Sequence, residues 1–477
     1  MNTYDLAALS AFELSAVMTA DLDSQLRRHF DKGPRQEDLT FAIWRPSSST
    51  LRYTAVLGEL LLPSSSDRIL NGNAAFTGDY FSRVLAAVPD GAGIAFLHSH
   101  LKPGWQGMSY NDTVAERDRL AAAVAGRTGL PLLGLTWGTD GAWSARFWAR
   151  TAPFKYERLD AAVVRVAGPD RLTLTFHPQL RPPPKVSAAQ VATASVWGER
   201  AQEDLARVRV GIVGLGSVGS VVADALSRMG VSDLLFLDHD IIEERNLDRT
   251  LHAVPEDARV GTPKVAVAER GTTTSHTARD FRVRALPVSL LTDEGLAAAL
   301  DCDVIICCVD RPWPRAILNA MAYAHLIPVI DGGIMTRVTP EGRPLNIDWR
   351  IHTVGPGRAC MYCLGALLRS DVALDRDGML DDPDYIRGLK PEDRERYNRR
   401  NVFAFSLAVA AHENLQLAGM IAGSSRIGGV GPQHYSAYPG EMTVSETTTC
   451  EPDCEIAALT ATAVGLEVRP PVAGRAP

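Results

Sequence analysis

Cysteine does not occur before Cys302 in this 477-residue chain, and no stretch approaches the about 18 consecutive apolar residues that predict a transmembrane helix. The first residues carry acids throughout and lack the basic start of a signal peptide. The seven cysteines, an odd number placed late, argue against a disulfide framework. With 49 basic and 56 acidic residues, the net charge of −7 gives no support for a nucleic-acid partner. We therefore expect a cytoplasmic protein that binds neither a membrane nor nucleic acid.

The length and composition predict a globular α/β protein with more than one domain. The hydrophobic content of 46% and the charged content of 22% are typical of soluble folds, and 477 residues exceed one ordinary core. Three consecutive prolines in RPPPK exclude a helix or a central strand there. We expect an α+β domain over 1–180, a linker over 181–194, and a second domain over 195–477. The second domain opens with a strand, a glycine turn, a helix and a strand, the start of a parallel sheet.

Two histidines end the apolar run GIAFL in the first domain. His98 and His100 are two residues apart, so on a strand both imidazoles face the same side. Ser109 and Asp112 follow after a loop that contains glycine and proline. Two histidines and one aspartate leave one position of a tetrahedral zinc open, which is the catalytic pattern. Such a zinc lowers the pKa of water to about 7, and a nearby carboxylate must accept the proton.

This pattern, HSH followed by S-x-x-D, resembles the JAMM motif of the JAB/MPN metallopeptidases, which have a deaminase-like α+β fold. Those enzymes cut peptide or isopeptide bonds after the C-terminus of ubiquitin-like proteins. The resemblance implies that the two histidines and the aspartate bind zinc and that Ser109 stabilises the oxyanion. It also implies a general base on an earlier strand, for which Glu59 is the candidate, although Glu116 and other acids are also available. Eight residues separate the second histidine from the serine, where the family usually has seven.

A glycine turn opens the second domain. Gly214, Gly216 and Gly219 follow the strand VRVGIV and precede a helix, the context in which a GxGxxG turn binds phosphate. Asp238 and Asp240 end the next strand, where a carboxylate can accept hydrogen bonds from ribose. Taken alone, this arrangement would predict a dinucleotide-dependent dehydrogenase.

Further motifs in the order D-x-D, N-L-x-R and G-x-P-K, and then an aspartate in CVDRPWPRAILN, resemble the ThiF/MoeB/E1 superfamily over about residues 195–455. The resemblance implies a Rossmann-like domain with a mainly parallel sheet that adenylates a carboxylate with ATP and Mg²⁺, and that forms a homodimer. Cationic groups must hold the triphosphate during such a reaction. The implied roles are ribose binding by Asp238, phosphate binding by Asn246, Arg249 and Lys264, Mg²⁺ binding by Asp310, and support from Asp240 and Arg315.

Two close pairs of cysteines predict a second zinc site. Cys360 and Cys363, with Cys450 and Cys454, can complete a Cys₄ tetrahedron, which leaves no open position and is therefore structural. Many E1-like proteins carry paired cysteines at these places. The remaining cysteines lie in the apolar run CDVIICCVD and are expected to be buried packing residues.

No cysteine is therefore a good candidate for an E1-type thioester. Either the domain stops at the acyl-adenylate and passes it to another nucleophile, or a hydroxyl such as that of Ser370 forms an oxyester.

Together the two resemblances imply a bifunctional enzyme that adenylates the C-terminal glycine of a ubiquitin-like modifier and cleaves bonds after that modifier. An E2-like protein is the expected partner, and a bacterial operon, in antiphage defence, is the setting by analogy. Two alternatives stay open. One is activation and processing of a ThiS/MoaD-type sulfur carrier. The other is a binding scaffold in which one or both sites are inactive.

Overall fold

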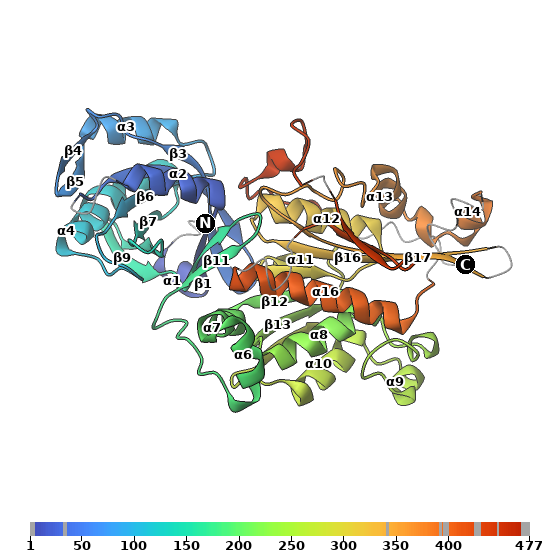
Figure 1. Cartoon of the computed structure of the whole chain (residues 1–477). Coiled ribbons are helices and arrows are strands. Elements are labelled where there is room, and N and C mark those ends of the chain that lie inside the picture. Colours follow the sequence, from blue (N-terminus) through green and yellow to red (C-terminus); the bar gives the residue numbers. More distant parts are fainter. Residues whose placement is uncertain are drawn as a thin grey trace.

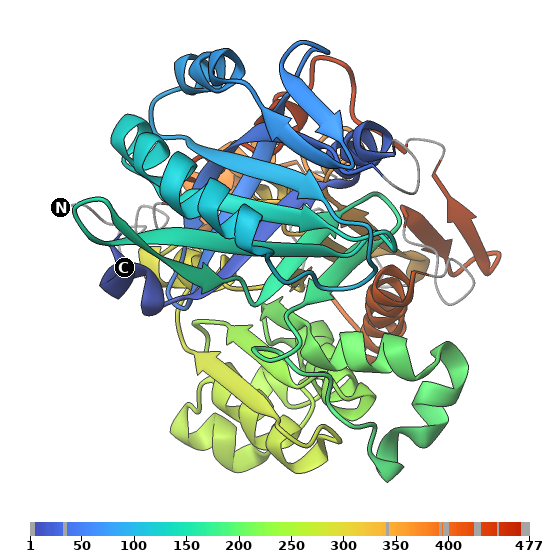
Figure 2. The ribbon, with the colours of Figure 1, turned by 90° about the vertical axis from the view of Figure 1, so that its left-hand side faces the viewer.

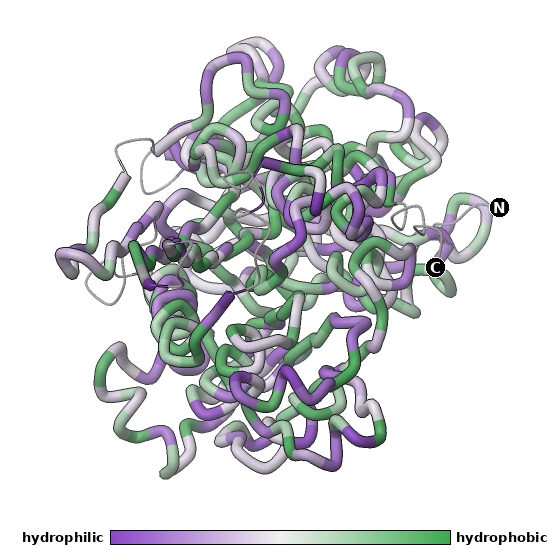
Figure 3. The backbone as a smooth tube through the Cα atoms, turned by 90° about the vertical axis from the view of Figure 1, so that its right-hand side faces the viewer, coloured by the Kyte–Doolittle hydropathy of each residue, from purple (hydrophilic) through white to green (hydrophobic). Residues whose placement is uncertain are grey.

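A computed structural model of the chain describes residues 5–31, 36–339, 343–390, 394, 400–423, 431–445 and 448–468. Two large sheets lie beside each other, one in each half of the chain, and each carries helices (Figure 1). Apolar and polar segments alternate along the backbone (Figure 3), and within the described ranges no helix is long and apolar enough to cross a bilayer.

The N-terminal half forms a mixed nine-stranded sheet. Its strands contain many buried β-branched and aromatic residues, which suit the pleated surface. In spatial order they are β11 (Leu172–Phe176), β10 (Val163–Ala167), β1 (Glu13–Thr19), β3 (Arg52–Leu61), β2 (Leu39–Ser48), β6 (Gly93–Ser99), β7 (Leu132–Trp137), β8 (Trp143–Ala152) and β9 (Lys155–Asp160). The small hairpin is β4 (Arg68–Asn71) and β5 (Asn73–Phe76).

Short helices accompany this sheet (Figure 2). Thr19 and Thr77 begin two of them, because each threonine side chain accepts a backbone N–H of the first turn. The helices are α1 (Leu6–Ser10), α2 (Ala20–Phe30), α3 (Gly78–Ala87), α4 (Tyr110–Thr113), the π-helical segment η1 (Val114–Leu120) and α5 (Ala121–Thr128).

The second half is built on an eight-stranded sheet. Its first five strands in spatial order are parallel and the rest are antiparallel, so the mainly parallel sheet expected is in fact mixed. The strands are β14 (Arg282–Leu286), β13 (Asp233–Leu237), β12 (Arg209–Val213), β15 (Val304–Cys307), β16 (Val329–Val338), β17 (Pro344–Val354), β18 (Gln433–Ser436) and β19 (Glu441–Val444).

Helices surround the parallel strands, as their apolar sequences require. They are α6 (Val191–Trp197), α7 (Glu199–Arg207), α8 (Ser217–Met229), α9 (Pro255–Val260), α10 (Lys264–Ser275), α11 (Asp293–Ala299), α12 (Pro312–Ala324), α13 (Arg369–Arg376), α14 (Pro383–Gly388) and α16 (Phe403–Ala422). The helix α16 lies against α8 and α7 (Figure 1).

The predicted linker over 181–194 is too long at its C-terminal end. Residues 182–187 have no regular structure, but a 3₁₀ turn follows at once and α6 begins at Val191. Proline explains the extended part, since three consecutive prolines cannot donate the hydrogen bonds of a helix.

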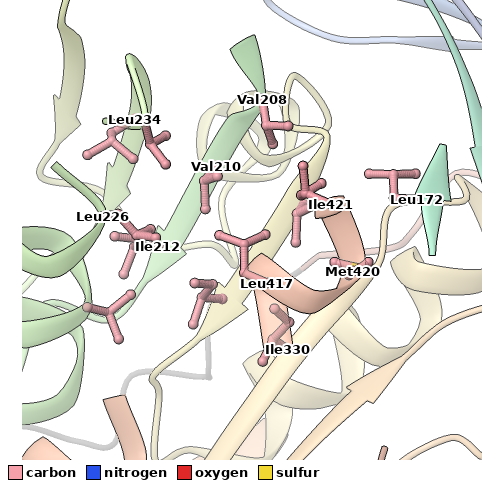
Figure 4. Close-up of a cluster of buried hydrophobic side chains, with 14 of the residues drawn as sticks. Leu172, Val208, Val210, Ile212, Leu226, Leu234, Ile330, Leu417, Met420 and Ile421 are labelled. Carbon is pink, nitrogen blue, oxygen red and sulfur yellow. The ribbon is translucent and has the colours of Figure 1, made fainter. Parts of the chain in front are cut away.

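The two halves share one apolar core. Leu172 of β11 and Val17 of β1 belong to the same buried cluster as Val210 of β12 and Leu417 of α16. Figure 4 shows Leu172 close to Ile421 on α16, although the two come from different halves of the chain. The halves are therefore not independent domains on a flexible spacer.

A buried ionic network crosses the same boundary. Arg52 of β3, fully buried, donates to Glu13 at 2.7 Å and to Asp303, which precedes β15, at 2.6 Å. The backbone N–H groups of Leu51 and Arg52 donate to Asp301. The charges of Arg52, Glu13 and Asp303 are thus paired with one another, and pairing is the condition for burying charged groups.

Candidate functional sites

The first predicted site is assembled by the end of β6 and the start of α4. Nε2 of His98 lies 3.2 Å from Nε2 of His100 and 3.7 Å from Oδ1 of Asp112. Nε2 of His100 lies 3.2 Å from Oδ2 of Asp112. A tetrahedral zinc with ligands at about 2.0–2.2 Å has ligand–ligand edges of about 3.3–3.6 Å. The three side chains thus fit one zinc ion as they stand.

Local structure fixes each of these ligands. The two imidazoles leave the same face of β6 because they are two residues apart. Ser109 caps α4: its hydroxyl accepts from the Asp112 N–H at 3.1 Å, and the Asp112 carboxylate accepts from the Ser109 N–H at 2.7 Å. Ser109 therefore orients Asp112, the predicted zinc ligand. This contact is compatible with the predicted role of Ser109 in stabilising an oxyanion.

Charge and burial differ between the two histidines. Burial lowers the pKa of His98 to about 3, and the positive charge of Arg146 acts in the same direction. Burial is the largest influence on His100 and disfavours its charged form, but the hydrogen bond with Asp112 and the charges of Asp112 and Glu37 together outweigh burial and raise its pKa. The pKa of Asp112 is held well below its usual range, because its hydrogen bonds to His100 and Ser109 and the charge of His98 outweigh burial.

The structure places Glu59, the predicted general base, away from the two histidines. Glu59 is exposed on β3. On the same strand, Leu61 pairs with Phe41 of β2, which in turn pairs with Phe96 of β6. Glu59 is therefore about four residues along from the row of His98, and β3 is two strands away from β6. At about 3.3 Å per residue and 4.8 Å per strand, the Cα atoms of Glu59 and His98 lie about 16 Å apart.

Glu37 occupies the place predicted for Glu59. It precedes β2, whose Leu39 pairs with His98, so the antiparallel register brings Glu37 next to His100. Burial raises the pKa of Glu37, and His100 and Asp112 are both close enough to act on it, in opposite directions. A carboxyl with a raised pKa beside a zinc site is suited to accept and return a proton. The signal in the sequence was the pair of acids Glu37 and Asp38 directly before the apolar run that starts at Leu39.

The glycine turn in the second half has the predicted geometry. Gly214 has a φ of +92°, and a Cβ there would come within 2.7 Å of the Cys308 carbonyl oxygen. A Cβ on Gly219 would come within 1.8 Å of the Gly214 carbonyl oxygen. The turn therefore requires glycine at both positions. Gly216 precedes α8 as its N-cap, in open space.

The start of α8 is held by a hydroxyl network that was not foreseen. The Asn401 amide donates to the Ser217 hydroxyl at 2.8 Å, and the Ser406 hydroxyl donates to it at 2.9 Å. These two residues lie about 190 positions away, at the start of α16, so no local signal could identify them.

Asp238 and Asp240 lie at the carboxyl end of β13, where ligands of open α/β sheets bind. The Asp238 carboxylate accepts from the N–H of Leu215 at 2.7 Å and from that of Asp240 at 2.9 Å, and burial raises its pKa. The Lys264 ammonium donates to the Asp240 carboxylate at 2.7 Å. The structure thus brings the glycine turn, both aspartates and Lys264 into one cluster.

Two other predicted phosphate ligands have structural contacts. The Asn246 side-chain oxygen accepts from the Glu243 N–H at 2.9 Å and so caps a 3₁₀ turn. The Arg249 guanidinium donates to Asp248 at 2.7 Å and to a backbone carbonyl. Both side chains are partly exposed, and their amide and guanidinium groups retain further donors.

Asp310 and Arg315 both follow β15 in the chain, and Arg315 lies on α12. Asp310 is exposed, and its charge acts on Arg315. Arg315 is bidentate to the buried Asp331, at 2.9 and 2.7 Å, which Arg350 also contacts. Arg315 therefore forms a structural ion pair with Asp331. This geometry favours a supporting role for Arg315 over direct contact with a nucleotide.

The four predicted cysteine ligands converge. The ligand atoms of Cys360, Cys363, Cys450 and Cys454 lie within 4.8 Å of one another. The Sγ atoms of Cys360 and Cys454 are 3.7 Å apart, and Zn–S bonds of about 2.3 Å give tetrahedral edges of about 3.8 Å. The pKa of Cys450 is lowered mainly by a hydrogen bond with the Cys360 side chain, and the Cys360 N–H, which donates to the Cys450 sulfur at 3.2 Å, acts in the same direction.

The remaining cysteines are buried or nearly so. Burial raises the pKa of Cys302 to about 12 and places those of Cys307 and Cys308 well above the ordinary value. Thiols with such raised pKa values are poor nucleophiles. Ser370 is exposed on α13 and its hydroxyl donates only weakly to Asp371 at 3.4 Å.

Comparison with known proteins gives a family match within the second half. Residues 188–374 match the model of the ThiF family. The chain is 29% identical over 182 residues to ubiquitin-like modifier-activating enzyme 5 of Drosophila virilis, which covers 35% of this chain and 42% of the relative. The enzyme of the same name from Drosophila melanogaster gives the same values. The chain thus spans about two fifths of the length of these curated relatives, 42% in both cases.

Among solved structures, E. coli MccB with ATP superposes with a TM-score of 0.44 at 16% identity, over 57% of this chain and 74% of that one. TcdA (CsdL) gives a TM-score of 0.28 at 25% identity, over 31% of this chain and 58% of that one. The family model thus matches residues 188–374 of the second half, which include the glycine turn, Asp238, Lys264 and Asp310. The family match does not include any residue before 188, so the JAB/MPN assignment of the first half stays a prediction.

Proposed function

We propose that the chain adenylates the C-terminal glycine of a ubiquitin-like modifier, with ATP as the second substrate. The match of residues 188–374 to the ThiF family carries this proposal. An oxygen of the modifier's carboxylate attacks the α-phosphorus of ATP, a new P–O bond forms, and the bond to pyrophosphate breaks. The free N–H groups at the start of α8 bind phosphate oxygens, and Lys264, with Asn246 and Arg249, offsets the charge that moves to the pyrophosphate.

Asp238 would accept hydrogen bonds from the ribose, and Asp310, with Asp240 in support, would hold Mg²⁺ near the phosphates. A divalent cation there supplies charge neutralisation. The cluster of Asp240 and Lys264 keeps the ammonium at the edge of β13 before a nucleotide arrives.

We also propose that the first half is a zinc peptidase that cleaves after the same modifier. The spacing of the three ligand atoms, 3.2 to 3.7 Å, carries this proposal. Zinc would lower the pKa of a water molecule to about 7. Glu37 would accept the proton of that water and return it to the leaving amine, while Ser109 keeps Asp112 in place.

The acyl-adenylate would pass to a nucleophile outside this chain. The described cysteines are either members of the Cys₄ cluster or buried or nearly so, and this favours an E2-like partner as the acceptor. An oxyester on Ser370 is the alternative. Incubation with ATP and modifier, followed by thiol or hydroxylamine, separates the two, because an oxyester resists thiol and yields to hydroxylamine. A homodimer formed through the second half is part of the same proposal.

The decisive experiment is ATP–pyrophosphate exchange that depends on a candidate modifier ending in glycine. Absence of exchange with every such modifier would reject the adenylation proposal and favour a scaffold. A zinc count separates the two metal sites: we expect about two ions per chain, one lost in His98→Ala and the other in Cys363→Ser. Formation of a C-terminal thiocarboxylate with a sulfur donor would favour sulfur-carrier activation.

A further inference from the structure

Behind the predicted zinc site lies a fully buried carboxylate that the proposed chemistry does not use. Glu116 belongs to the π-helical segment η1, a form of helix often found at functional sites. Its Oε2 accepts from Arg146 Nε at 2.8 Å and from Trp148 Nε1 at 2.7 Å, and its Oε1 accepts from a second guanidinium nitrogen. The carboxylate is thus fixed in one orientation.

The fixed carboxylate faces the unused nitrogen of a zinc ligand. His98 Nε2 points to His100 and Asp112, while its buried Nδ1 has no hydrogen-bond partner in the described part of the chain. That Nδ1 lies 4.0 Å from Glu116 Oε1. A metal-binding histidine normally donates its other N–H to a carboxylate or carbonyl, which fixes its tautomer and ring orientation.

The neighbouring strand is shaped around this carboxylate. Gly134 of β7 lies between Phe96 of β6 and Arg146 of β8. A Cβ on Gly134 would come within 2.3 Å of Glu116 Oε2 and 2.8 Å of Arg146 Nε. Glycine in the middle of a strand weakens the strand, so its presence indicates that another group needs the space.

A stabilising role alone does not explain the arrangement. A buried Arg–Glu pair gives little net stability, because the loss of hydration offsets the attraction. Here the pair also reaches the site through a second path: Arg146 Nη1 donates to Thr136 at 2.7 Å, and Thr136 pairs with His98 across β6 and β7.

We propose that Glu116 is a positioning residue, held by Arg146 and Trp148 in space left by Gly134, that orients His98 for zinc by accepting its Nδ1–H. The inference rests on the proposed zinc site, and it adds a residue that the HSH and S-x-x-D motifs do not contain. It needs a movement of about 1 Å to bring the two atoms from 4.0 Å to hydrogen-bond distance.

The test is a titration of the full-length metal-free protein with Zn²⁺ against a competing chelator, with the His98 site identified as the step lost in His98→Ala. Glu116→Gln removes the charge at nearly constant size, and Gly134→Ala displaces the carboxylate without altering it. Both are expected to weaken zinc binding at the His98 site by about 10- to 100-fold. The matched control is Asp303→Asn, which also removes the charge of a buried carboxylate paired with arginine, Arg52, but at the boundary between the halves. It should change zinc affinity by less than about twofold, since it leaves Glu116 and its hydrogen-bond partners unchanged.

Wild-type affinity in Glu116→Gln would overturn the inference, and so would an equal loss in Asp303→Asn, because general loosening would then explain both. A wild-type protein that binds no zinc through His98 would also overturn it. The peptidase proposal is judged separately, by cleavage of a modifier fusion: if wild type does not cleave but Glu116→Gln still loses zinc affinity, the positioning role stands and the peptidase proposal falls.

Discussion

Replacing Arg52 by methionine tests whether the boundary between the halves stabilises the whole chain. Arg52 donates to Glu13 at 2.7 and 3.0 Å and to Asp303 at 2.6 Å, and no part of its side chain is exposed. Methionine has a similar length but no charge, so it leaves two carboxylates without their main partner. Breaking a buried pair by removing one member costs about 3–5 kcal/mol.

The assay is urea denaturation followed by circular dichroism. With a denaturant slope of about 3 kcal/mol/M, this loss lowers the midpoint of unfolding by about 1.0–1.7 M. Arg259→Met is the control, because its pair with Glu256 is exposed on α9 and such pairs contribute about 0–1 kcal/mol. If the midpoint of Arg52→Met lies as close to wild type as that of Arg259→Met, the ionic network at the boundary does not stabilise the whole chain.

The pH dependence gives a second readout of the same change. Burial acts to raise the pKa of Glu13, but the charges of Arg52, Arg209 and Arg181 outweigh burial and hold it well below the ordinary value. A carboxyl with a lowered folded-state pKa stabilises the protein above its unfolded pKa of about 4.3, and this stability is lost as the pH falls below that value. The free energy of unfolding of the wild type should fall between about pH 5 and about pH 3. In Arg52→Met this fall should be smaller, because the variant lacks a charge that lowers the pKa of Glu13.

Three further predictions concern the sites and one buried histidine. Lys264→Ala should lower modifier-dependent ATP–pyrophosphate exchange by about 100-fold or more while cleavage of a modifier fusion continues, because only the first reaction needs the ammonium. Glu37→Gln should abolish cleavage and retain zinc, because it removes only the proton acceptor, whereas Glu59→Gln should cleave like wild type. The reverse pattern would instead make Glu59 the general base. Burial lowers the pKa of His325 to about 4, so stability should fall as the pH drops from about 6.5 towards 4, and His325→Gln should flatten that dependence in thermal melts.

The parts of both sites that depend on local geometry could be predicted from the sequence. The alternation of side chains on a strand was enough to bring His98 and His100 together, and the strand–turn–helix context was enough for Gly214 and Gly219. The two cysteine pairs also converge as expected, although about 90 residues separate them.

The parts that depend on register between distant strands could not be predicted. Glu37 reaches His100 only because β2 pairs antiparallel with β6, with Leu39 opposite His98. A different register would place another residue beside His100. The roles of Arg315 and Arg52 depend on Asp331 and Asp303, partners that only the folded sheets bring within reach. Single arginines on a strand carry no signal of such partners.

The common core of the two halves constrains how a modifier could travel. Leu172 packs into the same cluster as Leu417, and Ser47 bonds to His325 at 2.8 Å, so the separation between the zinc ligands and the glycine turn is set by close packing. Under the proposed function, no swinging of one half over the other can carry the tail from one centre to the next. A modifier released by cleavage must leave the protein and rebind, or be carried by another molecule, before its carboxylate can be activated again.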